Sequence, residues 1–332
     1  MLQLLRGKRL PFLIAVLAIA LSGCSASPLV PKGQQAREQL DLMILSLAIM
    51  TLVVVVVFSI AIYVLIKFRR RKGDDEIPKQ VEGNHKLEII WTVIPLILLL
   101  ILIVPTVGRT FNHDQNLSED PNAVKVQVVA HQFWWEFNYP ELGIYTSQDL
   151  VIPVGRDISF ELTSADVIHS FWIPALGGKK DTNPGLTSYF HLTPLETGVY
   201  KGKCAELCGD SHALMDFTVV VVSEEEFNAW VENMREPAQA VAAEDLEQGR
   251  VIYEANCLYC HAVQPDVRSA VAPHLNGFAD RQRIAGILPH NEENLKDWIR
   301  DPAEIKPGTL MPKMPLSEEE LDQLTKFLLE LK

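Results

Sequence analysis

The hydrophobic positions divide the chain into three parts. Nearly every residue from 42 to 66 is apolar, and a second apolar run covers about 89–107. Each run is long enough to cross a bilayer as a helix, which takes about 20 residues. From 119 the apolar positions form short alternating runs typical of strands, and from 244 the composition favours helices. The pattern predicts a multidomain protein: a two-helix transmembrane hairpin, an all-β domain and a small all-α domain.

Charges around the apolar runs indicate how the hairpin is oriented. A cluster of lysines and arginines at 67–72 follows the first run at once, which marks the cytoplasmic side of the membrane. The second run contains Pro95 and Pro105, which membrane helices tolerate when neighbours pack against them. Both ends of the hairpin, within 24–118, therefore lie outside, and the domains that follow lie there too.

The first residues have the features of an export signal. Basic residues at 6–9 precede an apolar stretch at 10–21, which is the order found in signal peptides. The stretch ends in Leu21-Ser22-Gly23-Cys24, which resembles a bacterial lipoprotein cleavage box. The resemblance implies that residues 1–23 are removed and that Cys24 carries lipid; the alternative is a plain signal peptide with an incidental cysteine.

Short β-rich runs fill the region from 119 to 234. Residues 124–129 alternate between apolar and polar, and 157–163 and 215–222 read similarly. Turn sequences at Pro153-Val154-Gly155 and Asn183-Pro184-Gly185 separate such runs. This spacing predicts an antiparallel sandwich or barrel, on which loop residues are held rigidly.

One loop of this domain concentrates soft metal ligands. Cys204 and Cys208 are four residues apart, His212 follows after four more, and Met215 three beyond that. Thiolate, imidazole and thioether together favour copper, zinc or iron–sulfur chemistry. Two cysteines at this spacing can bridge two metal ions, the pattern of the dinuclear copper electron-transfer site CuA. Zinc would be satisfied by four ligands and would leave Met215 unexplained.

A further copper ligand is expected from another strand. His169 precedes an apolar strand and a proline, while His131 and His191 are alternatives on composition alone. The residues by themselves leave this choice open.

The last part of the chain carries a heme-attachment motif. Residues 235–243 read as a linker, and in 244–332 the sequence Cys257-Leu258-Tyr259-Cys260-His261 is the covalent c-type motif. The two cysteines would form thioethers and His261 would coordinate the iron. Met311 and Met314 compete for the sixth position, and we favour Met311 because its distance from the next helix is common in class I cytochromes c. A methionine ligand raises the heme potential.

Three segments resemble cytochrome c oxidase subunit II from the hairpin to about Trp230. They are Asn84-His85-Lys86-Leu87-Glu88-Ile89-Ile90-Trp91-Thr92-Val93-Ile94-Pro95, the stretch His169-Ser170-Phe171-Trp172-Ile173-Pro174 with Gly178 to Gly185, and the C-x-E-x-C-x3-H-x2-M loop. The resemblance implies a cupredoxin-like fold for the β domain. It selects His169 as the upstream ligand, beside Cys204, Cys208, His212 and Met215.

The resemblance assigns roles to two glutamates. The main-chain carbonyl of Glu206 would be the remaining copper ligand, and its side chain matches a ligand to magnesium or manganese at the interface with the large subunit. A carboxylate suits such a hard ion. Glu88 matches the glutamate at the entrance of a proton path; the alternative is a glutamate solvated at the membrane interface.

The sequence departs from the family at one aromatic position. Phe133 stands where a tryptophan usually receives electrons from external cytochrome c, and Trp134 and Trp135 either take that role or pack on the sheet. The departure favours the tethered heme as the main electron source. In the heme domain, Pro273 lies in a segment resembling the family's proline loop, so its carbonyl would accept a hydrogen bond from His261. His274 and His290 are expected to be ordinary loop residues.

These features predict subunit II of a proton-pumping bacterial cytochrome c oxidase with a fused class I cytochrome c. Its partners would be membrane lipid, subunit I, subunit III and an external cytochrome c; its redox domains would lie on the periplasmic or extracellular face of the cell membrane. The net charge of −12 argues against nucleic-acid binding and suits a basic protein partner.

Three other functions were weighed. A nitric oxide or nitrous oxide reductase subunit could use the same copper domain. A copper-handling lipoprotein would need neither covalent heme nor bridging thiols. A quinol oxidase subunit II would lack these copper ligands.

Overall fold

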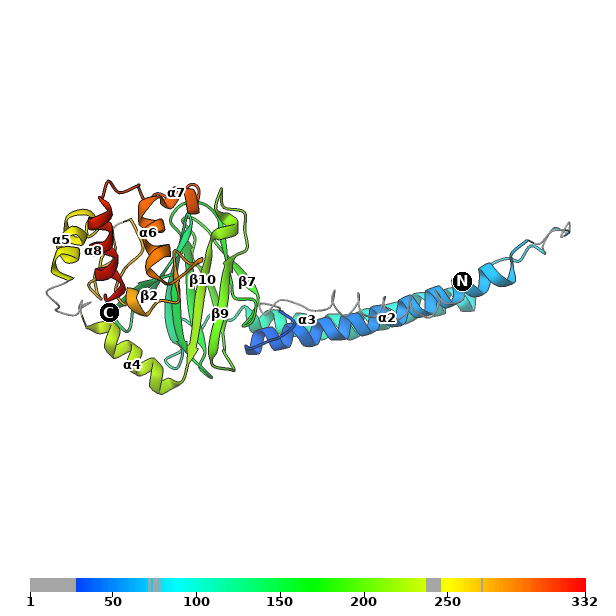
Figure 1. Cartoon of the computed structure of the whole chain (residues 1–332). Helices are drawn as coiled ribbons and strands as arrows, with labels where there is room; N and C mark the ends of the chain where they lie inside the picture. The colour runs from blue at the N-terminus through cyan, green and yellow to red at the C-terminus, as the bar shows by residue number, and fades with distance from the viewer. Residues whose placement is uncertain (1–27, 71–72, 74–76, 78, 237–245, 270) are drawn as a thin grey trace, which may run out of the picture. The chain divides into compact units, whose positions relative to one another are not determined.

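The computed structural model describes residues 28–70, 73, 77, 79–236, 246–269 and 271–332. Residues 37–115 form one compact unit, and 116–332 with the segment before 37 form the other (Figure 1). The first unit consists of two long helices, α2 (Gln34–Lys67) and α3 (His85–His113), both long and apolar enough to span a membrane. The apolar runs predicted at 42–66 and 89–107 lie inside these helices.

The second unit begins with two five-stranded sheets. One sheet has the order β3-β2-β1-β5-β8 and the other β4-β10-β9-β6-β7. Their bounds are β1 Val124–His131, β2 Trp134–Tyr139, β3 Ile144–Ser147, β4 Asp149–Pro153, β5 Ile158–Ser164, β6 His169–Trp172, β7 Lys179–Thr182, β8 Ser188–Leu192, β9 Gly198–Cys204 and β10 Asp216–Val222. Helix α4 (Glu224–Arg235) follows, opened by a capping box at Ser223 and Glu226.

The prediction of a β-sandwich is confirmed, but the expected antiparallel arrangement is wrong for one pair of strands in each sheet. β1 pairs parallel with β5, and β10 pairs parallel with β4. Parallel neighbours cannot be joined by a tight turn, so other strands intervene in the sequence. Alternation of apolar and polar residues predicts which strands form but carries no information about their direction.

Aromatic side chains fill the space between the sheets. Trp135 and Phe137 from β2 are fully buried with Phe171 from β6 and Phe217 from β10. The rings of Phe171 and Phe217 stack with centroids 5.0 Å apart, and Trp135 meets Phe171 edge-on at 5.5 Å. These large rigid rings fix the spacing of the sheets directly beside His169, whose ring lies 6.1 Å from that of Trp135.

The C-terminal part is mainly helical and has its own apolar core. Its elements are α5 Glu247–Asn256, η3 Phe278–Asp280, β11 Arg283–Ile284, β12 Leu288–Pro289, α6 Glu292–Arg300, α7 Pro302–Ile305 and α8 Glu318–Leu329. Ser317 and Glu320 cap α8 in the predicted capping box. Phe327 of α8 packs on Tyr253 of α5, which brings the last helix against the one that precedes the heme motif.

Candidate metal and heme sites

The structure brings the predicted copper ligands together at one end of the sandwich. His169 begins β6, Cys204 ends β9, and His212 lies in the 3-10 helix η1 (His212–Leu214). The Sγ atoms of Cys204 and Cys208 are 3.8 Å apart. His169 Nδ1 lies 3.9 Å from Cys204 Sγ. Two ligands lie near Cys208 Sγ: His212 Nδ1 at 3.6 Å and Met215 Sδ at 3.7 Å. Each thiol therefore has its own imidazole, with the two sulfurs between them.

The two thiols interact closely and shift each other's pKa in opposite directions. A hydrogen bond from Cys208 lowers the pKa of Cys204 far below that of a free thiol, and His169 adds to this effect. The pKa of Cys208 is raised by its hydrogen bond to Cys204 and by burial. Thiolates are the form that binds metal, so metal binding would release protons from the two cysteines. The donor set, buried except for a half-buried His212, fits soft metal ions.

Asp166 orients His169 and was not predicted from the sequence. Its Oδ1 lies 2.7 Å from Nε2 of His169, so that Nδ1 faces the thiols. Burial disfavours the charged imidazole, but hydrogen bonds to Cys204 and Asp166 outweigh it and raise the pKa of His169. A carboxylate on the outer nitrogen of a metal-binding histidine fixes the ring and its tautomer. An acidic residue three positions before the histidine was the available signal.

Glu206 places its carbonyl and its side chain in different surroundings. The carbonyl oxygen lies 3.2 Å from Cys204 Sγ, at the edge of the cluster, while the side chain is exposed. The alternative histidines lie elsewhere: His131 pairs with Glu136 at 3.2 Å, and His191 is buried in β8.

The three aromatic residues at 133–135 have different positions. Trp135 is fully buried in the core, whereas Phe133 and Trp134 line a cavity of about 440 Å³. Trp134 is half-buried and stacks flat on His131, with ring centroids 4.0 Å apart. The opposite wall of this cavity belongs to the heme-motif region, so the aromatic pair faces that region directly.

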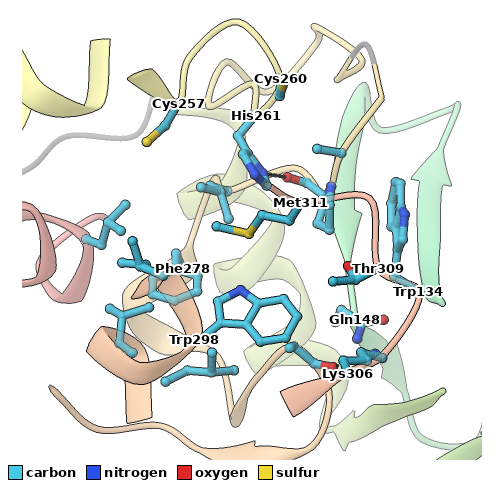
Figure 2. Close-up of a pocket in the computed structure, with 18 of the residues that line it drawn as sticks. Trp134, Gln148, Cys257, Cys260, His261, Phe278, Trp298, Lys306, Thr309 and Met311 are labelled. Atoms are coloured by element: carbon cyan, nitrogen blue, oxygen red, sulfur yellow. Dashed lines mark hydrogen bonds between the residues drawn. The ribbon is translucent and has the colours of Figure 1, made fainter. Parts of the chain in front are cut away.

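The heme motif directly follows helix α5, and its side chains line the same cavity. Cys257, Cys260, His261 and Met311 all line it (Figure 2). His261 Nδ1 lies 2.7 Å from the carbonyl oxygen of Pro273, which leaves Nε2 for a metal ion. Burial lowers the pKa of His261, so the ring is neutral and able to coordinate.

The cavity also contains a buried cation with an unused donor. Arg281 lines it, is 8% exposed, and its Nε has no hydrogen-bond partner among the described residues. Burial lowers the pKa of Arg281 to about 10. An apolar cavity with a guanidinium at its wall fits a flat apolar ring system that carries carboxylates. In Figure 2 the Met311 side chain lies close to the His261 ring, and Met314 lines the cavity as well.

His274 and His290 lie in loops, as expected from the sequence, but both rings are packed against neighbouring residues. His274 is 2% exposed, and burial lowers its pKa to about 4. Its Nε2 lies 2.9 Å from the carbonyl oxygen of Gln264. His290 packs on Phe278 with ring centroids 5.0 Å apart. His274 also contacts the β domain through its main-chain amide, which donates to Ser147 Oγ, and no local motif indicates these contacts.

Glu88 lies in the first turn of α3. The turn is capped by Asn84, whose side-chain oxygen accepts hydrogen bonds from the amides of Lys86 and Leu87. The Glu88 carboxylate is about half exposed and lies 3.5 Å from His85 Nδ1. The lipoprotein site at Cys24, the signal peptide at 1–23 and most of the linker at 235–243 lie outside the described residues.

Three protein families match consecutive parts of the chain. The transmembrane domain of cytochrome c oxidase subunit II matches residues 25–108, and the periplasmic domain of the same subunit matches 142–223. The cytochrome c family matches 246–332. Together these matches cover more than half of the sequence.

Relatives of similar length agree with these families. The chain is 48% identical to cytochrome c oxidase subunit 2 of Alkalihalophilus pseudofirmus, with 96% of each chain covered. It is 37% identical to quinol oxidase subunit 2 of Bacillus spizizenii, over 75% of this chain and 79% of the relative. Among solved structures, the periplasmic domain of cytochrome oxidase subunit II of Bradyrhizobium japonicum is 33% identical. That match covers 34% of this chain and 94% of the other, with a TM-score of 0.33.

Proposed function

Because the chain belongs to the cytochrome c oxidase subunit II family, we propose that it takes electrons at a covalent heme c and passes them through CuA to subunit I. The chain is part of a heme–copper oxidase, with two transmembrane helices followed by an extracellular domain. Oxygen reduction and proton pumping take place in the complex, and this chain is the part that receives electrons.

The convergence of the copper ligands supports the assignment most strongly. His169, Cys204, Cys208, His212 and Met215, with the Glu206 carbonyl, would hold two copper ions, which when bound exchange single electrons. The Sγ–Sγ distance of 3.8 Å supports a role for both thiols in one metal site. Asp166 contacts Nε2 of His169 and would favour the tautomer whose Nδ1 is free to bind copper. The buried aromatic core prevents the ligands from spreading and keeps water away from them.

The C-terminal residues would hold the heme. Cys257 and Cys260 would be joined to it covalently, which ties a one-electron carrier to the chain. His261 and Met311 would be the axial ligands, with Pro273 fixing the ring of His261. Arg281 would pair with a heme carboxylate, which explains a buried guanidinium whose Nε is otherwise unpartnered.

Further roles follow from the family resemblance. The exposed Glu206 carboxylate would bind magnesium or manganese at the interface with subunit I, and Glu88 would stand at the entrance of a proton path. Subunit III would be a second protein partner, an external cytochrome c the electron donor, and Cys24 the point of lipid attachment.

The alternative functions are less well supported. A nitric oxide or nitrous oxide reductase subunit is not favoured, because close relatives over the full length are cytochrome c oxidase subunits. A copper-handling lipoprotein has no use for a heme-attachment motif beside an apolar cavity.

Reciprocal cysteine variants of the full chain test this function. Wild type should contain two copper ions with a mixed-valence EPR signal and one covalent heme. Cys208→Ser should lose the copper signal and keep the heme, whereas Cys257→Ser should keep the copper signal and lose one thioether. A wild-type preparation that binds a single zinc ion, or no covalent heme, would contradict the proposal.

A further inference from the structure

The copper-binding sandwich and the heme-motif domain share a buried polar interface. Three main-chain amides donate across it. Tyr145 donates to the carbonyl oxygen of Pro265 at 3.1 Å. On the other side, His274 N donates to Ser147 Oγ and Gln282 N to Asp149 Oδ2, both at 2.9 Å. Ser147, Asp149 and His274 are each less than 9% exposed, so water does not replace these bonds.

An ion pair closes one side of this interface. Arg268 Nε and a second guanidinium nitrogen lie 2.7 and 3.2 Å from the two carboxylate oxygens of Glu136. Burial raises the pKa of Glu136, but hydrogen bonds from His131 and Arg268 outweigh this and lower it. A two-point contact with a 7%-exposed carboxylate is geometrically specific. Removing Arg268 would leave that carboxylate buried with only His131 as partner.

Close backbone approach brings the ligand-bearing loops of the two domains together. Ser211, next to the copper ligand His212, donates to the carbonyl oxygen of Pro307 at 2.6 Å. A Cβ on Gly308 would lie 3.1 Å from the Phe133 ring, and a Cβ on Gly286 would overlap the main-chain oxygen of Asp216. The loop that carries Met311 therefore lies directly on the copper loop.

We propose that this interface docks the heme domain permanently on the copper domain, with Glu136 and Arg268 as the residues that position it. The proposal rests on the proposed function and adds a consequence to it. Phe133 is 4% exposed and lies beneath the Gly308 loop, so an external protein cannot contact its ring while the heme domain is docked.

Hydrogen exchange of the full, heme- and copper-loaded chain measures docking directly. The amides of His274 and Gln282 should be protected in wild type, because each donates to the other domain. Arg268→Gln should raise their exchange rate on the order of tenfold or more, since it strands a buried carboxylate. The double variant Glu136→Gln/Arg268→Gln should regain part of the amide protection, because it leaves no buried carboxylate without its arginine.

Two further variants separate docking from general destabilisation. Arg250 is the matched control: its side chain is exposed to a similar degree, and its ion pairs are with Glu247 and Glu254 on its own helix. Arg250→Gln should leave the exchange rates of the His274 and Gln282 amides unchanged. Gly286→Asn should raise the exchange rates of both amides as Arg268→Gln does, but without changing the charge of the protein. Asparagine tolerates the φ of +79°, and its Cβ would push against the main chain of Asp216.

The salt dependence of heme-to-copper electron transfer provides a second readout. A docked domain should transfer electrons at the same rate in about 0.01 M and about 1 M salt, because no encounter between separate charged surfaces is needed for salt to screen. In Arg268→Gln the rate should fall and become salt-dependent. Equal exchange in Arg268→Gln and Arg250→Gln, or unprotected amides in wild type, would overturn docking. Absence of heme or of the two-copper signal would instead overturn the proposed function, and the exchange result would still decide docking.

Discussion

Asp166 provides the sharpest test of how the copper ligands are positioned. Its carboxylate contacts Nε2 of His169 through Oδ1 and accepts hydrogen bonds from the amides of Val167 and Gln132 at 2.7 and 2.6 Å. Asp166→Ala removes both oxygens and with them all three of these contacts, and the His169 ring loses the contact that fixes its rotation and tautomer. Asp166→Asn keeps the shape and one acceptor oxygen but removes the negative charge.

The two substitutions should weaken copper binding to different degrees. Loss of the outer partner of a metal-binding histidine typically costs about 10–100-fold in metal affinity. Each tenfold corresponds to about 1.4 kcal/mol of binding free energy. Because asparagine can still accept a hydrogen bond, Asp166→Asn should reduce the copper-binding free energy by about 1.4 kcal/mol, the lower end of this range. Asp166→Ala should reduce the copper-binding free energy by up to about 2.8 kcal/mol.

A chelator competition on the full chain measures these affinities. Copper bound per chain and the visible absorption of the dinuclear site are followed as chelator concentration rises. Asp181→Asn is the control, because this exposed aspartate on β7 belongs to the same sheet as His169. If Asp166→Ala and Asp181→Asn released copper at the same chelator concentration, Asp166 would have no positioning role.

Three further results are expected. Met311→Ala should abolish the low-spin His/Met optical signature of the heme while Met314→Ala spares it; the reverse would reassign the ligand. Glu88→Ala in the assembled complex should slow proton-coupled turnover, and unchanged turnover would leave it an interfacial glutamate. Because the pKa of Glu136 is lowered in the folded protein, its stabilising ion pair is present above the ordinary value of 4.5 and is lost as pH falls through the lowered pKa. The difference in melting temperature between wild type and Glu136→Gln should therefore shrink below pH 4.5.

Local spacing in the sequence predicted the candidate ligands of the loop, and the structure brings these side chains together. Cys204, Cys208, His212 and Met215 lie within one short loop, so the chain itself keeps them together whatever surrounds them. The apolar runs and the capping box at Ser317 are local as well, and the helices follow them. Selecting His169 needed the family resemblance, because a ligand on a separate strand has no spacing that marks it.

The contacts between distant segments could not be predicted. Glu136 and Arg268 are 132 residues apart, and nothing near either residue indicates the other. The burial of His274 could not be predicted, because it depends on a separate domain packing over it. The same reason applies to the parallel strand pairs, whose direction depends on the path of the chain rather than on residue pattern.

The segments that carry the proposed copper ligands are joined by main-chain hydrogen bonds. Cys204 N donates to the carbonyl oxygen of Met215 at 3.0 Å, and Ala205 N to that of Ser170 at 2.9 Å, beside His169. Ligands on three segments therefore cannot move apart without breaking backbone bonds within a buried sheet. An electron-transfer site benefits from this restraint, since ligands that stay in place when the charge changes require little reorganisation. The fold thus supplies the rigidity, and the loop supplies the chemistry.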